Sequence, residues 1–157
     1  MTTRTTQSLQ ERYAPHNQCF GCGPANERGL RLRSLVDGDA LVATFRPEAH
    51  HQAFPGVLNG GITGALLDCH GNWAAAHALM ITRALDAPPC TVTADFHVTL
   101  RRPTPLDAEF ALWARPVSIE GDKVIVEATL TAVGKVSATM RGTFVAVREG
   151  HPAYHRW

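Results

Sequence analysis

The sequence has no excess of charge of either sign. Its 157 residues carry 15 lysines and arginines against 14 aspartates and glutamates, for a formal net charge of +1. Proteins that bind nucleic acid or membrane surfaces usually carry a basic excess, so neither partner is expected. The hydrophobic content of 45% and the charged content of 18% are typical of a globular chain with a core, and the length suits one domain.

A long hydrophobic run is also missing from the sequence. No segment approaches the roughly 20 consecutive apolar residues that span a bilayer. Residues 1–11 lack the apolar stretch of a secretory signal. We therefore expect a cytoplasmic protein that has no membrane partner.

Cysteine and serine patterns argue against three further classes. The four cysteines are expected to be reduced thiols rather than a disulfide framework. Cys19 and Cys22 form one Cys-x-x-Cys pair, but no second pair of cysteines or histidines follows at zinc spacing. No metal site is therefore expected, and the pair is expected to pack a loop near the mouth of a site. No serine lies in a Gly-x-Ser-x-Gly motif, which argues against a serine hydrolase.

Alternation and turn residues predict an α+β domain. The expected elements are a short helix near 7–13, two strands over 30–33 and 41–45, one long proline-free helix from 61 to about 85, and four strands over 92–100, 108–117, 123–133 and 136–147. Short loops between the last strands predict antiparallel neighbours. An antiparallel sheet of about five or six strands should therefore wrap round one long central helix. This domain is expected over 29–150, between an N-terminal extension (1–28) and a C-terminal tail (151–157).

The run FPGVLNGGITGALLD over residues 54–68 has the character of an active site. Asn59 is a favoured N-cap residue, and Gly60 and Gly61 leave backbone N–H groups uncovered where the long helix begins. Such a helix start favours developing negative charge. Asp68 follows among apolar neighbours, and burial there should raise its pKa, as suits a base.

These features resemble the hotdog-fold thioesterases, in particular the branch similar to phenylacetate-degradation (PaaI-type) acyl-CoA thioesterases. The resemblance covers most of the chain and rests on the 54–68 run, on DFHVTLRRP over 95–103 and on NQCFGCG over 17–23. It implies hydrolysis of an acyl-CoA without a separate cofactor. The Gly60 N–H would polarise the thioester carbonyl, and Asp68 would activate water or attack directly. It also implies a homodimer, or a dimer of dimers, with sites at the interface.

The spacing of these two groups independently predicts a dimer. Asp68 follows Gly60 by eight residues, which is about 12 Å along a helix. One thioester carbon cannot contact both groups at that separation. The carboxylate and the amide must then come from two chains whose helices pack antiparallel across a two-fold axis.

Four more residues are candidates for the same site. Asn59 stands where the resemblance implies a histidine, and it is expected either to position the substrate or only to cap the helix. Gly61 adjoins the polarising amide, and His51 is expected to line the entrance. Thr93 matches a hydroxyl that assists in some relatives, although strand alternation places it opposite the apolar face of its strand.

Arg101 and Arg102 are candidates for the nucleotide end of the substrate. Guanidinium groups suit phosphate oxygens, so these side chains are expected either to bind the coenzyme A phosphates or to be solvated at a strand end.

Two other functions on the same fold remain as alternatives. Asn59 and Ala53 replace the histidine and the asparagine that the resemblance implies, so one alternative is a non-catalytic acyl-CoA-binding module. The other is a hydratase or dehydratase, which would need a histidine and an aspartate acting on one acyl chain, with His70 as the candidate histidine.

Overall fold

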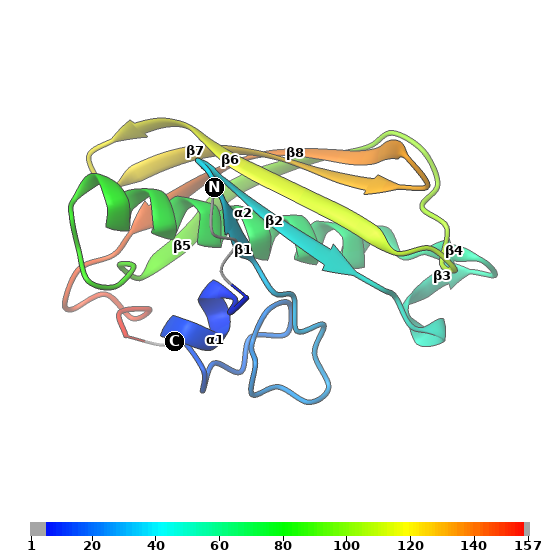
Figure 1. Cartoon of the computed structure of the whole chain (residues 1–157), viewed down its shortest axis with the longest axis horizontal. Helices are drawn as coiled ribbons and strands as arrows, with labels where there is room; N and C mark the ends of the chain where they lie inside the picture. The colour runs from blue at the N-terminus through cyan, green and yellow to red at the C-terminus, as the bar shows by residue number, and fades with distance from the viewer. Residues whose placement is uncertain (1–5, 156–157) are drawn as a thin grey trace.

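The computed structural model describes residues 6–155 and confirms the predicted α+β architecture. A six-stranded antiparallel sheet in the order β1-β2-β6-β7-β8-β5 curves around the long helix α2, Gly60–Thr82 (Figure 1). The strands are Leu35–Asp37 (β1), Ala40–Phe45 (β2), Thr91–Leu100 (β5), Phe110–Glu120 (β6), Lys123–Ala132 (β7) and Lys135–Ala146 (β8). Strand β2, the long helix and the four strands after it follow one another as the sequence predicts.

Three small elements complete the described fold around this frame. Helix α1, Leu9–Tyr13, lies within the predicted short helix. A 3-10 turn, Ala49–His51, and a two-stranded hairpin, Gln52–Phe54 (β3) with Val57–Leu58 (β4), lie between β2 and α2 and have no counterpart in the prediction. The hairpin stands at the N-terminal end of α2 (Figure 1).

Two of the boundaries that differ from the predicted ones lie where the backbone is left-handed. The predicted strand over 30–33 is wrong: Arg31 has φ 53°, and β1 begins only at Leu35. Leu30 and Leu32 are nevertheless buried. The long helix ends at Thr82 rather than near residue 85, and Ala84 has φ 52°.

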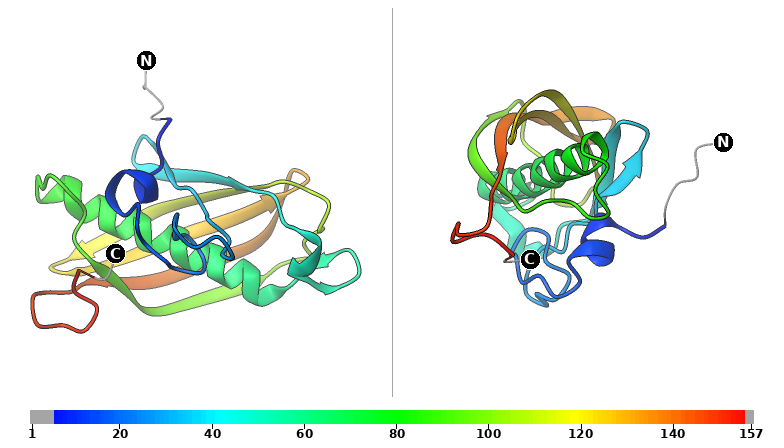
Figure 2. Two further views of the ribbon diagram at one scale, coloured as in Figure 1. Left: turned by 90° about the horizontal axis from the view of Figure 1, so that it is seen from below. Right: turned by 90° about the vertical axis from the view of Figure 1, so that its left-hand side faces the viewer.

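Helix α2 is apolar on nearly every side because two layers cover it. The curved sheet covers one side, and the segment that precedes β1 covers the other (Figures 1 and 2). Leu66, Leu67, Trp73, Ala75 and Leu79 are all at most 1% exposed. A helix without a polar stripe is stable only when buried in this way. No helix within residues 6–155 has the length and apolar character needed to cross a membrane.

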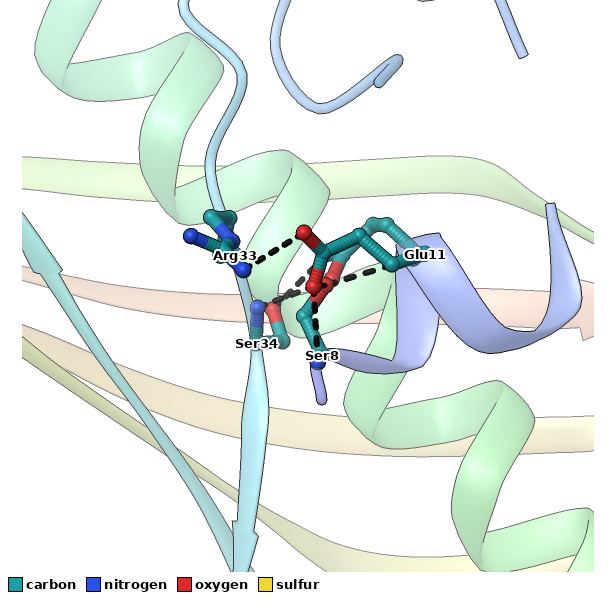
Figure 3. A network of polar contacts seen from close by, with 5 residues as sticks. Ser8, Glu11, Arg33 and Ser34 are labelled. Atoms are coloured by element: carbon teal, nitrogen blue, oxygen red, sulfur yellow. Dashed lines mark hydrogen bonds and ion pairs between the residues drawn. The ribbon is translucent and has the colours of Figure 1, made fainter. Parts of the chain in front are cut away.

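Polar contacts fasten the N-terminal segment to this core. Glu11 of α1 bonds Ser8 and pairs with Arg33 (Figure 3). Deeper, the Gln10 side chain donates to Ser34 Oγ at 2.9 Å. Ser34 Oγ lies 2.8 Å from His70 Nδ1 on α2, so α1 reaches the central helix through buried hydrogen bonds.

Candidate active site

The start of helix α2 presents one free backbone amide. Asn59 Oδ1 accepts hydrogen bonds from the N–H groups of Gly61 at 2.8 Å and Ile62 at 3.3 Å, so Asn59 is the N-cap. The expectation of two uncovered amides is therefore wrong for Gly61. Within residues 6–155 the Gly60 N–H has no hydrogen-bond acceptor. This amide, at the positive end of the helix, is available to an anion or a polarised carbonyl.

A cavity of about 420 Å³ opens at this helix start. It lies between the β3–β4 hairpin, the first turn of α2 and the segment after β5. Its lining residues are Ala53, Phe54, Val57, Leu58, Gly60, Thr63, Leu100, Arg101, Arg102, Pro103 and Thr104. The cavity is thus mainly apolar and carries the free amide and two cations.

Arg101 and Arg102 stand at this cavity as exposed side chains. Arg101 Nε donates to Thr139 Oγ1 at 3.3 Å, and Arg102 Nε donates to the Val136 carbonyl at 3.1 Å. These bonds hold the base of each guanidinium against β8 and leave its terminal nitrogens for a ligand. Both arginines therefore lie in the same cavity as the Gly60 amide.

Asp68 is the carboxylate that this region of α2 contributes. It is half-buried, and the Thr93 hydroxyl on β5 donates to Asp68 Oδ1 at 2.6 Å. Burial raises the pKa of Asp68, the Thr93 hydrogen bond opposes that rise, and the charge of Cys19 adds to it. A carboxyl group with a raised pKa and one bonded oxygen is well suited to accept a proton.

The position of Thr93 corrects the alternation argument. Thr93 pairs with Phe144 and Asp95 pairs with Thr143, so Ala94 is an extra residue in β5 and forms a β-bulge. A bulge changes which face the following residues occupy. Thr93 precedes the bulge in the chain and points to α2. Phe96 follows the bulge and also faces α2, near Gly64, although a regular strand would place residues 93 and 96 on opposite faces.

His51 bonds the loop that leads into α2 and is not among the residues that line the cavity. Its side chain is buried, and its Nδ1 accepts the Glu48 N–H at 3.0 Å. Its carbonyl accepts the Asn59 N–H at 2.9 Å. Burial lowers the pKa of His51. His51 thus holds the loop that carries the N-cap, and its expected place at the entrance of a site between two chains stays a prediction.

His70 belongs to the core. It is fully buried, with Nδ1 beside Ser34 and Nε2 3.1 Å from the Leu41 carbonyl. Burial lowers its pKa to about 4. Both ring nitrogens have partners inside the protein, so the hydratase alternative loses its candidate histidine.

Gly60 and Asp68 do not meet within one chain. Asp68 is absent from the lining of the Gly60 cavity, and eight residues of helix separate them by about 12 Å. The loop that carries Cys19 and Cys22 packs against α2 next to Asp68, where Cys19 Sγ lies 3.7 Å from Cys69 Sγ. Cys69 is a residue of this region that the sequence analysis did not single out.

Solved structures resemble the chain, whereas no protein-family model and no curated protein matches its sequence. It is similar to a thioesterase superfamily protein from Shewanella loihica, with 31% identity and a TM-score of 0.64 over 74% of this chain and 91% of that one. A second thioesterase superfamily protein has 23% identity and a TM-score of 0.68 over 83% of this chain and 60% of its own length. A phenylacetic acid degradation-related protein from Ralstonia eutropha has 22% identity and a TM-score of 0.61, over 74% of this chain and 86% of that one. The last two likenesses concern the fold alone.

Proposed function

The chain belongs to the thioesterase superfamily, and from this premise we propose that it hydrolyses acyl-CoA thioesters, as the PaaI-type branch does. The observation that carries the proposal is Asp68, a half-buried carboxyl with a raised pKa whose Oδ1 is held by Thr93. The free Gly60 amide in a cavity with two arginines supports it. An amide aimed at developing negative charge is the usual means of stabilising an oxyanion.

The complete site would form between two chains. Gly60 and Asp68 are too far apart on one helix to act on one carbonyl carbon. Strand β5 is an edge of the sheet, and its outer side has no partner within residues 6–155. Pairing of two β5 strands about a two-fold axis would bring Asp68 of one chain to the Gly60 amide of the other.

The reaction would then proceed by general base catalysis. The Gly60 N–H donates to the thioester oxygen, and Asp68 takes a proton from water as the water oxygen bonds to the carbonyl carbon. The tetrahedral intermediate collapses, the carbon–sulfur bond breaks, and the proton returns from Asp68 to the coenzyme A sulfur. Direct attack by Asp68 would give an anhydride that water then hydrolyses to the same products.

A substrate panel with an Asp68→Asn variant tests this function. Short, medium, long and aromatic acyl-CoA compounds should include at least one that the protein hydrolyses. Loss of the base is expected to lower kcat by about 100- to 10,000-fold. Thioester absorbance should be followed directly, because the four free cysteines would react with a thiol reagent.

The matched control is Asp37→Asn, which changes an exposed aspartate at the end of β1 and should leave turnover unchanged. Near-normal turnover by Asp68→Asn would contradict the role of Asp68. Binding of acyl-CoA without hydrolysis of any compound would instead establish the binding module.

A further inference from the structure

Three thiols from distant parts of the sequence meet beside helix α2. The Sγ atoms of Cys19, Cys22 and Cys69 lie within 4.8 Å of one another, and those of Cys19 and Cys69 are 3.7 Å apart. All three cysteines are free. Sulfurs bonded to one tetrahedral Zn²⁺ at about 2.3 Å are about 3.8 Å apart. The Cys19–Cys69 separation therefore matches an edge of a zinc tetrahedron.

The loop backbone is shaped to let the third sulfur approach. Residues 19–23 turn tightly, with the Gly23 N–H donating to the Cys19 carbonyl at 2.8 Å. A Cβ on residue 21 would lie 2.4 Å from Cys69 Sγ, so a side chain there would have to displace this sulfur. The turn thus presents Cys19 and Cys22 together to a helix that carries Cys69.

The three sulfurs are close enough to share one cation, since all three Sγ atoms lie within 4.8 Å of one another. A bound cation would stabilise all three sulfurs as thiolates together.

We propose that Cys19, Cys22 and Cys69 bind one Zn²⁺ ion per chain, with solvent in the fourth position. Thiolates select thiophilic ions such as Zn²⁺ and Cu⁺. The three thiolates lie next to the Asp68 carboxylate, so the site is strongly negative. The two positive charges of Zn²⁺ offset this negative charge better than the single charge of Cu⁺, which favours Zn²⁺. Three Zn–S bonds form, and the thiol protons pass to solvent. The ion would fasten the N-terminal loop to α2 one residue from Asp68.

Metal binding to the reduced full-length protein tests the site. Metal-free protein is incubated with Zn²⁺, passed through a desalting column and analysed for metal by mass spectrometry. One zinc ion per chain is expected. Co²⁺ in place of Zn²⁺ should give thiolate charge-transfer bands in the near ultraviolet and strong tetrahedral bands in the visible, and this measurement needs no variant.

Cysteine variants locate the bound ion. Cys69→Ser is expected to lose zinc on the column, with its fold checked by circular dichroism. Cys90→Ser is the matched control, because Cys90 is buried elsewhere and its Sγ accepts the His155 N–H at 3.2 Å; it should retain one ion. Gly21→Ala keeps every thiol but displaces Cys69, and it should bind zinc more weakly.

Several results would overturn the proposal. One is reduced wild-type protein that retains no zinc and gives no thiolate–cobalt bands. Another is equal loss of zinc from Cys69→Ser and Cys90→Ser. Retention of Cu⁺ without Zn²⁺ would overturn the assignment of the ion.

Discussion

At the scale of single residues, the two oxygens of Asp68 have different surroundings. Oδ1 accepts the Thr93 hydroxyl at 2.6 Å, and no residue within 6–155 bonds Oδ2. The hydrogen bond orients the carboxyl group and favours its charged form, while burial favours the neutral form and has the larger effect on the pKa. Thr93 is therefore a positioning residue for the base.

Replacement of Thr93 should change the pH dependence of the reaction. In Thr93→Val the bond that lowers the pKa of Asp68 is gone, so the pKa rises further. Catalysis needs the deprotonated carboxylate, so the acid limb of kcat/KM should move to higher pH. On the acid limb, below the pKa of Asp68, activity should fall about tenfold, because a hydrogen bond to a charged group contributes roughly 1.5 kcal/mol.

Thr93→Ser keeps the hydroxyl and serves as the control for this profile. It should restore both the position of the acid limb and most of the rate. An acid limb that stays in place in Thr93→Val would show that Thr93 does not act on the base.

The two cavity arginines make a separate prediction about substrate binding. Arg101→Ala with Arg102→Ala removes the cations beside the Gly60 cavity. If they bind phosphate oxygens of coenzyme A, KM should rise more for acyl-CoA than for an acyl-pantetheine thioester, with kcat little changed. Steady-state kinetics on both substrates measures this, and equal increases would exclude the phosphate contact.

At the scale of elements, helix α2 lies close against strand β8 at Gly71, where the helix has no side chain. A Cβ on Gly71 would lie 2.6 Å from Met140 Cε and 2.9 Å from Phe144 Cζ of β8. Phe144 is fully buried, so its ring has little room to move. The position of α2 against β8 therefore depends on glycine at residue 71.

A matched pair of glycine variants tests this contact. Gly71→Ala should lower the free energy of unfolding by about 1–3 kcal/mol, because overpacking outweighs the better helix propensity of alanine. Gly64→Ala is the control: its Cβ would lie 3.8 Å from Phe96 Cε2, an ordinary contact, and stability should stay equal or rise. Urea denaturation measures both. Equal stability of the two variants would contradict the tight contact at Gly71.

At the scale of the whole molecule, exposed apolar side chains gather around the start of α2 and along β5. Phe54, Phe96 and Leu100 are 60%, 44% and 57% exposed. Leu100 packs against Gly60, Phe96 lies near Gly64, and Phe54 lines the Gly60 cavity. An edge strand with exposed apolar side chains is a surface that a second copy can cover. This agrees with the two-chain site we propose.

Mixed dimers should recover activity if each site uses two chains. Gly60→Pro removes the polarising N–H, and proline is well tolerated at the first helical position; Asp68→Asn removes the base. Each variant alone should be nearly inactive. A dimer of one Gly60→Pro chain and one Asp68→Asn chain has one site with both native groups. Random mixing of equal amounts should therefore restore about a quarter of the wild-type activity.

Two controls accompany this complementation. Gly60→Pro is expected to lose about 100- to 1,000-fold in kcat, because it lacks the polarising N–H. Gly60→Ala keeps this N–H and should be much more active than Gly60→Pro. Sedimentation should show a dimer for each variant. Absence of any recovery in dimers proved to be mixed would place both groups in one chain and refute the two-chain site.

The sequence by itself determined the order of the elements and the chemistry at the start of α2. Both depend on neighbours in the chain: alternation marks strands β5 to β8, the proline-free run marks α2, and Asn59 before two glycines marks the helix cap. These are local properties, since the backbone of a few residues decides them. Arg31 has φ 53°, a left-handed backbone conformation that strands do not adopt, and the prediction of a strand over 30–33 failed there.

Only the tertiary structure decided which distant groups meet. Thr93 meets Asp68, 25 residues away in the chain, on the part of β5 that precedes the bulge at Ala94, and the loop before β1 brings Cys19 to Cys69, 50 residues away. The tertiary structure also shows that the rings of His51 and His70 make hydrogen bonds inside the protein. No local pattern encodes such contacts, because they depend on how the curved sheet and the N-terminal segment pack against α2.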